Sequence, residues 1–221
     1  MALVFGPDAF TVGADTNIDA YPAAGADYIY TVGSGAGLTV NAANDRVQNT
    51  LVATDAIARV SDAAAPTGAQ ENICDASDDG ANHYGSVHAR CASAADNDYL
   101  GQVTTADVSE CYLARRDAGT FVTLVNQDRG LATATHRLRL RAIGAGSAVS
   151  LETQIDDTRP LTFSDTAANR KTSGQPGLAG WNELTANLGW VDNLSVDDLA
   201  ATGFQARCGT LTIGTGIAGT T

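Results

Sequence analysis

The chain has 221 residues, which suits one large domain, and its 44% hydrophobic residues include a single Met and only 6% aromatic residues. Thirteen basic residues stand against 25 acidic ones, and the net charge of −12 argues against nucleic acid and anionic membranes as partners, because a negative surface repels phosphate. Residues 1–10 lack the basic segment and long apolar run of a secretory signal, so we expect synthesis in a cytoplasm without export.

Short segments in which apolar and polar residues alternate run along the chain. Alternation with a period of two is typical of a strand that has one face in a core and the other in solvent. In chain order, this pattern predicts strands at 28–32, 38–40, 86–91, 99–103, 111–115, 121–125, 136–142, 149–156, 194–196 and 211–213. Many short strands separated by turn residues favour a sandwich or a barrel.

The clearest pair of strands is 136–142 and 149–156. Leu138 and Leu140 share one face of the first segment, and arginines alternate with them on the other face. The residues between the segments include Gly144, which can adopt the positive φ that tight turns require. The two segments are therefore predicted to form an antiparallel hairpin.

Four segments have no clear alternation. Residues 54–63 suit either a short helix or a strand, and 182–188 is a second weak helix candidate. Residues 63–69 and 169–178 are predicted to be loops within one domain, since they are rich in Gly, Pro and polar residues. No alternation of strands with helices is visible, which argues against a parallel sheet.

The order of several short motifs resembles the concanavalin A-like and laminin-G-like jelly rolls found in phage and bacterial surface proteins. The motifs are the strand 138–144 (LRLRAIG), the acidic pair 156–157, the loop 174–178 (GQPGL) and the segment 191–199 (VDNLSVDDL). The resemblance implies an all-β antiparallel jelly-roll sandwich with little helix. It implies one domain over 1–221, with a core at about 8–200.

The same resemblance, with the acidic composition, suggests a non-enzymatic virion protein such as a phage capsid decoration, head-fibre or tail subunit. Its expected partners are capsid or tail proteins, and further copies of the chain. The uncharged segment 208–221 is expected to be a final strand or a tail that contacts a partner. A carbohydrate- or receptor-binding module of lectin type, with a surface glycan as ligand, is the alternative function, because this fold hosts many activities.

A polysaccharide-degrading hydrolase is the third alternative and is disfavoured. Hydrolases that resemble this fold carry paired carboxylates on one strand face, but the position that would partner Glu152 is Gln154. A Ser–His–Asp site has little support, because no nucleophile-elbow motif is present. His88 and His136 are interpreted as surface or inter-strand residues, and we expect no enzymatic activity.

Calcium is the one metal that the sequence suggests. Residues 74–82 are predicted to form an acidic turn in which Asp75, Asp78 and Asp79 supply hard oxygen ligands. The segment lacks EF-hand spacing, so a solvated acidic loop is the alternative interpretation. We expect no other cofactor.

Two kinds of side chain are candidates for ligand or partner contact. Trp181 follows a glycine-rich loop predicted at 177–180 and is interpreted either as a packing residue or as an exposed ring that would suit a sugar, whereas Trp190 is expected in the core. An arginine stripe could grip carboxylates of a partner subunit, or lie on a solvated sheet face balanced by Glu152 and Asp156. The stripe consists of Arg137, Arg139 and Arg141.

Four cysteines are spaced too widely for a typical zinc motif. The sequence favours small buried residues over one or two disulfides, and it does not choose among the possible pairings. They are Cys74, Cys91, Cys111 and Cys208.

Overall fold

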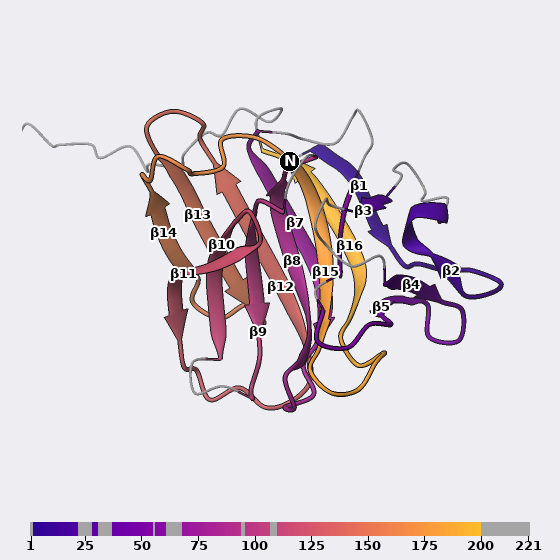
Figure 1. Ribbon diagram of the computed structural model, residues 1–221. Coiled ribbons are helices and arrows are strands. Elements are labelled where there is room, and N and C mark those ends of the chain that lie inside the picture. The colour runs from indigo at the N-terminus through magenta and orange to yellow at the C-terminus, as the bar shows by residue number, and fades with distance from the viewer. Residues whose placement is uncertain are drawn as a thin grey trace, which may run out of the picture.

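The computed structural model describes residues 2–21, 28–30, 37–54, 56–60, 68–93, 96–106 and 110–199, with backbone alone for 2–7. Two antiparallel sheets lie face to face and form a sandwich (Figure 1). The helical structure within these residues is one 3₁₀ turn, η1 (Ile18–Ala20). The all-β antiparallel sandwich that the family resemblance implied is confirmed.

The first sheet has nine strands among the described residues. Its edge strands are β14 and β2, and β1 pairs with β16 in addition to the strands of the main path. The sheet order is β14 (Leu161–Asp165), β13 (Val149–Ile155), β12 (Thr135–Ile143), β7 (Gln70–Ser77), β16 (Trp190–Asp198), β5 (Arg46–Asn49), β4 (Leu38–Asn41) and β2 (Thr16–Asn17), with β1 (Ala2–Asp8) beside β16.

The second sheet has seven strands among the described residues. The site considered below lies on its strands β8, β9, β10, β11 and β15. The sheet order is β11 (Thr120–Gln127), β10 (Cys111–Asp117), β9 (Asp98–Val103), β8 (His83–Cys91), β15 (Gln175–Asn182), β6 (Ala56–Val60) and β3 (Tyr28–Tyr30).

The core lies between the sheets and is built from small and branched side chains. The predicted hairpin is confirmed: β12 pairs with β13, and Leu138 and Leu140 are fully buried. A Cβ on Gly101 of β9 would lie 2.3 Å from Oγ1 of Thr153 on β13, so the two sheets come close together where a side chain is missing. Close packing of this kind explains how a core with few large residues is filled.

Several segments differ from the sequence-based expectation. Residues 56–60 are strand β6, and 182–188 contain turns rather than a helix. The loop predicted at 169–178 is wrong from Gln175 onwards, where β15 begins. A Cβ on Gly180 would lie 2.8 Å from the carbonyl oxygen of Gly189, so these glycines let backbones meet rather than form a turn.

Strands β5 and β7 were not predicted, because their sequences mix polar and apolar residues without regular alternation; β14 (LTFSD) was missed although its first four residues alternate. The predicted strand at 211–213, the partner-contacting tail at 208–221 and Cys208 lie outside the described residues, as does most of the loop at 63–69. No helix in the described part of the chain has the length and apolar character to cross a bilayer.

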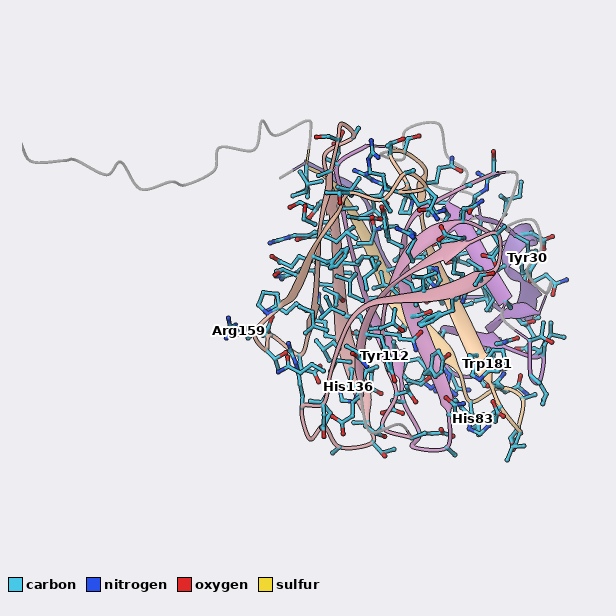
Figure 2. The ribbon with its side chains drawn as sticks, turned by 60° about the vertical axis from the view of Figure 1, so that its left-hand side comes forward. Tyr30, His83, Tyr112, His136, Arg159 and Trp181 are labelled. Atoms are coloured by element: carbon cyan, nitrogen blue, oxygen red, sulfur yellow. The ribbon has the colours of Figure 1, made fainter. Side chains whose placement is uncertain are left out.

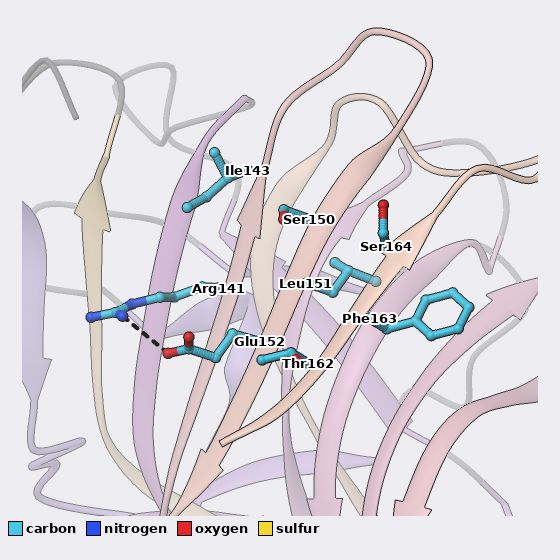
Figure 3. Close-up of a pocket in the computed structure, with 8 residues that line it drawn as sticks. All are labelled: Arg141, Ile143, Ser150, Leu151, Glu152, Thr162, Phe163 and Ser164. Atoms are coloured by element: carbon cyan, nitrogen blue, oxygen red, sulfur yellow. Dashed lines mark hydrogen bonds and ion pairs between the residues drawn. The ribbon is translucent and has the colours of Figure 1, made fainter. Parts of the chain in front are cut away.

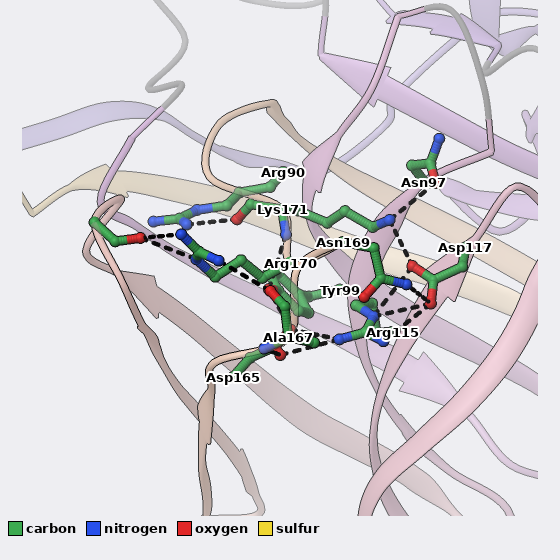
Figure 4. Close-up of polar contacts among 11 residues, drawn as sticks. Arg90, Asn97, Tyr99, Arg115, Asp117, Asp165, Ala167, Asn169, Arg170 and Lys171 are labelled. Atoms are coloured by element: carbon green, nitrogen blue, oxygen red, sulfur yellow. Dashed lines mark hydrogen bonds and ion pairs between the residues drawn. The ribbon is translucent and has the colours of Figure 1, made fainter.

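A cluster of charged side chains, which we call the polar clamp, joins the edges of the two sheets (Figure 4). Arg115 of β10 donates to Asp165 of β14 at 2.8 Å, and the Tyr99 hydroxyl donates to the same carboxylate at 2.7 Å. Asp117 accepts from Arg115 and, at 2.6 Å, from the ammonium of Lys171. Burial would raise the pKa of Asp165, but the bonds from Arg115 and Tyr99 outweigh it and hold that pKa below its ordinary value.

Candidate functional site

Three central strands of the seven-stranded sheet do not show the usual alternation of buried and exposed residues. β9 is buried at every position, β10 at all but its last, and β8 at all but one. A sheet of a sandwich normally buries one face and exposes the other. The outer face of this sheet is therefore covered or folded into a hollow along these strands.

An aromatic-lined cavity of about 420 Å³ lies on this outer face, and we call it the aromatic hollow. Five strands contribute to it, namely β8, β9, β10, β11 and β15. Figure 2 labels two of its residues, Tyr112 and Trp181, on this sheet. The hollow is lined by Tyr84, Tyr112, Phe121 and Trp181, together with the polar residues Asn82, Gln102, Thr104, Arg116 and Thr123.

Strand register explains why residues distant in the sequence meet here. Trp181 of β15 lies directly opposite Tyr84 of β8, so their side chains share one face. Tyr112 of β10 likewise lies opposite Gln102 of β9. The rings of Tyr112 and Phe121 meet edge to face with centroids 6.4 Å apart.

The polar residues of the hollow include one cation. The Arg116 guanidinium is buried and lies 3.3 Å from the Asp96 carboxylate, which fixes its position. Gln102 adds amide donor and acceptor groups to the lining of the same hollow. Aromatic faces with a few oriented polar groups suit a ligand that has flat apolar patches and hydroxyl groups.

The rim of the hollow is held by a buried histidine, His83. Its Nδ1 lies 2.8 Å from Asp79, and its Nε2 accepts hydrogen bonds from the backbone N–H groups of Leu184 and Thr185 at 3.2 and 3.1 Å. The turn before β8 is therefore tied to the turn after β15. Asn82, which lines the hollow, lies on the first of these turns.

The two tryptophans differ from each other. Trp181 lies in the aromatic hollow, although on a strand rather than after the loop predicted at 177–180. The expectation that Trp190 belongs to the core is wrong: it is half-buried, with the Arg46 guanidinium 4.6 Å above its ring. Its neighbour Val191 takes the core position, because successive residues of a strand face opposite sides.

The arginine stripe lies on the face of β12 opposite to the core and is balanced by acidic groups. Arg141 is 3.0 Å from Glu152, as the cross-strand interpretation expects, and it also pairs with Glu71. Asp156 instead pairs with His136, and the remaining partners come from β7, which was not predicted. Arg137 lies 3.6 Å from Asp75, and Arg139 lies 3.8 Å from Glu71. Contact of the stripe with a partner subunit stays a prediction.

A second cavity, of about 410 Å³, lies beside the stripe on β12, β13 and β14 (Figure 3). The ion pair between Arg141 and Glu152 forms part of its lining, with hydroxyls from Ser150, Thr162 and Ser164. Its single aromatic residue is Phe163. Two opposite charges that already satisfy each other leave little for a ligand to recognise, so the aromatic hollow is the stronger candidate.

The three aspartates suggested for calcium do not converge. Asp75 lies on β7, where it accepts a hydrogen bond from Asn193 at 2.9 Å, so the acidic turn predicted from residue 74 begins only after Ser77. Asp78 accepts from the backbone of Thr105, and Asp79 from His83. Both carboxylates thus stabilise turns. Calcium binding stays a prediction.

The described cysteines are buried as the sequence predicted, whereas His88 is placed more deeply than a surface residue. Cys74, Cys91 and Cys111 are buried and unbonded, which agrees with small core residues. Burial raises the pKa of the Cys111 thiol to about 11. His88, interpreted as a surface or inter-strand residue, is fully buried between strands.

Comparison with known proteins gives no family from sequence: no protein-family model matches the chain, and no curated protein matches it. Solved structures do match. The carbohydrate-binding module CBM66 from Bacillus subtilis has a TM-score of 0.55 at 17% identity, over 69% of this chain and 86% of that one. A Bacillus subtilis protein of unknown function with a galectin-like fold has a TM-score of 0.54 at 10% identity, over 84% and 95%. The chain thus has a lectin-like jelly-roll sandwich fold.

Proposed function

We propose that the chain is a carbohydrate-binding module and that its glycan binds in the aromatic hollow. The observation that carries the proposal is the gathering of Trp181, Tyr84, Tyr112 and Phe121 on one outer sheet face, beside Arg116 and Gln102. Sugar rings present C–H patches that stack on aromatic faces and hydroxyls that bond to polar side chains. The net charge of −12 favours neutral over strongly anionic polysaccharides.

The neighbour structures support this proposal through their fold. One of them is named as a carbohydrate-binding module, and another as galectin-like. A shared fold does not transfer a ligand, so the proposal depends on the side chains of the hollow. Virion assembly with capsid or tail partners stays a prediction, and so does the absence of enzymatic activity.

The test is binding of the full chain to a panel of soluble glucans, fructans, galactans and xylans, by gel retardation and calorimetry. We expect Trp181→Ala to weaken binding of the retained polysaccharide at least about tenfold, on the order of 1.4 kcal/mol, since buried tryptophans dominate recognition surfaces. Trp190→Ala is the matched control, because this tryptophan is half-buried outside the hollow.

Three outcomes would count against the proposal. If no polysaccharide of the panel retards the chain, these polysaccharides are excluded as its ligands. Equal binding by the Trp181→Ala variant would place the ligand elsewhere, as would greater loss in the Trp190→Ala variant. Circular dichroism of both variants separates loss of contact from loss of fold.

A further inference from the structure

A β-bulge near the end of β8 brings two side chains to the same face. Between the pairs His88–Gly177 and Cys91–Gln175, β8 advances three residues while β15 advances two. Arg90 carries the irregularity, with φ of 56°. In a regular strand, residues 88 and 91 would face opposite sides. Here a Cβ on Gly177, the partner of His88, would lie 2.8 Å from Sγ of Cys91.

The bulge is held by the buried side chain of Arg90. Its guanidinium donates to the carbonyl oxygens of Gly68, Lys171 and Gly144 at 3.2, 2.7 and 2.6 Å (Figure 4 shows the bond to Lys171). A residue with a side chain in this backbone region is strained unless its surroundings fix it. The structure therefore maintains the bulge by several bonds, and features so maintained often position functional groups.

Asp98, at the start of β9, completes a cluster with His88 and Cys91. The Nδ1 of His88 lies 3.1 Å from Oδ2 of Asp98. One ligand atom from each of the three residues lies within 4.8 Å of the other two. All three residues are at most 1% exposed. A nitrogen, a sulfur and a carboxylate oxygen thus converge in a site shielded from bulk water.

The converging atoms lack hydrogen-bond partners. Neither oxygen of Asp98, nor Nδ1 of His88, has one among the described residues, because the short distance between them is not aligned for a hydrogen bond. A buried carboxylate without a partner is costly. The other ring nitrogen of His88 is engaged, since its Nε2 lies 2.8 Å from Oγ of Ser86. If the ring proton is on Nε2, the lone pair of Nδ1 points into the cluster.

We propose that His88, Cys91 and Asp98 form a binding site for Zn²⁺, with a fourth position left for water or a ligand. Zinc takes nitrogen, thiolate and carboxylate ligands in tetrahedral geometry, and three protein ligands with an open position are typical of reactive sites. Ser86 acts as the outer partner that orients the imidazole. This inference does not depend on the proposed glycan site.

The geometry around Cys91 gives the cation an access route. Cys91 lines a surface cavity of about 550 Å³, with Arg59, Ser93 and Gln175 among its other residues. A metal site needs such a path as well as suitable ligands. The open coordination position would face this cavity, on the Cys91 side of the cluster.

A catalytic interpretation uses some of the same residues. Ser86, His88 and Asp98 stand in the order of a charge relay, a constellation that the sequence disfavoured. In such a relay Nδ1 donates to the carboxylate and the serine is accessible. Here that bond is misaligned and Ser86 is 3% exposed. The relay also gives no role to Cys91, so Cys91 separates the two interpretations.

The experiment uses the full chain without an affinity tag, stripped with a chelator and titrated with Co²⁺, then with Zn²⁺ in competition. We expect one equivalent of Co²⁺ to bind with a thiolate-to-cobalt charge-transfer band, and Zn²⁺ to displace it and raise the unfolding temperature. Cys91→Ala should abolish the band and weaken Zn²⁺ binding more than the roughly 10–100-fold cost of losing an outer partner. Cys74→Ala, a buried cysteine of the other sheet, is the matched control and should bind as the parent does.

A second variant, Asp98→Asn, keeps the volume of the side chain and should also lose Zn²⁺ affinity while its circular dichroism is unchanged. Absence of a charge-transfer band in the parent chain would overturn the proposal, and so would an equal band in the folded Cys91→Ala variant. Labelling of Ser86 by a fluorophosphonate, without stoichiometric metal binding, would overturn it in favour of the relay.

Discussion

The outer faces of the two sheets are built in different ways. On β12 and β13 the outward residues are at least partly exposed and mostly polar or charged, and the inward ones are buried, in strict alternation. On β8, β9 and β10 both sets are buried. Leu100 of β9 is fully buried although its neighbour Gly101 faces the other sheet, and His88 lies directly opposite Leu100.

This difference suggests that the outer face of β12 only stabilises the fold, whereas the outer face of the seven-stranded sheet is the candidate binding surface. The charged face of β12 neutralises itself through pairs such as Arg141 with Glu152, and it needs no other molecule. The outer face of the seven-stranded sheet instead gathers aromatic rings and, farther along the same strands, buried groups without hydrogen-bond partners. Burying a polar group without a hydrogen bond costs free energy of folding, and such groups are therefore expected mainly at functional sites.

The largest effect is expected in the polar clamp. Arg115→Met leaves the Asp165 carboxylate without its cation, and breaking a buried pair from one side costs about 3–5 kcal/mol. The measurement is the free energy of unfolding from urea denaturation at neutral pH. A cost below about 1 kcal/mol would show that the clamp contributes little beyond the hydrophobic core.

The pH dependence of the same variant sharpens this test. Because the pKa of Asp165 is depressed in the folded protein, its contribution is present above the unfolded value of about 3.9 and is lost as pH falls through the lower folded value. Asp117, whose pKa is depressed by Lys171 and Arg115 against the effect of burial, adds to the same loss. In Arg115→Met the pKa of Asp165 in the folded protein should rise toward its unfolded value or above it, so this acid-dependent loss of stability should become smaller than in the parent chain.

The comparison of the faces is tested most directly by Leu100→Ala. If the outer face of β9 is packed as tightly as a core, this change should cost about 2–5 kcal/mol, similar to Leu138→Ala on the inner face of β12. Both variants are measured by urea denaturation. A cost for Leu100→Ala near zero, with Leu138→Ala in the expected range, would contradict the packed outer face.

The smallest effect is expected on the outer face of β12. The side chain of Arg137 is 56% exposed, and its nearest carboxylate is 3.6 Å away. Arg137→Ala should change the free energy of unfolding by no more than about 0.5 kcal/mol. A loss above about 2 kcal/mol would show that the arginine stripe supports the fold, and the distinction between the two faces would fail.

Alternation made part of the fold predictable, because it depends only on residues adjacent in the sequence. It located β12 and β13 and the hairpin between them. It missed β7, a central strand paired on both sides, and β15, whose Gly177 and Gly180 resemble turn residues until neighbouring backbones are seen against them.

The candidate sites were harder to predict, because they depend on strand register. Trp181 and Tyr84 are far apart in the chain, and only the pairing of β15 with β8 places them together. The cluster of His88 and Cys91 requires the bulge at Arg90, since regular alternation separates them. Trp181 was named as a candidate contact residue from its chemistry rather than its position, and it lines the aromatic hollow.

The ties made by His83 have a consequence for how the aromatic hollow would meet a ligand. Both turns at the rim are already fastened through Asp79, Leu184 and Thr185. An arriving molecule would therefore not have to order these loops, and little conformational entropy would be lost on association. A rim of this kind favours rapid binding of a ligand to a pre-organised surface over slow closure of loops around the ligand.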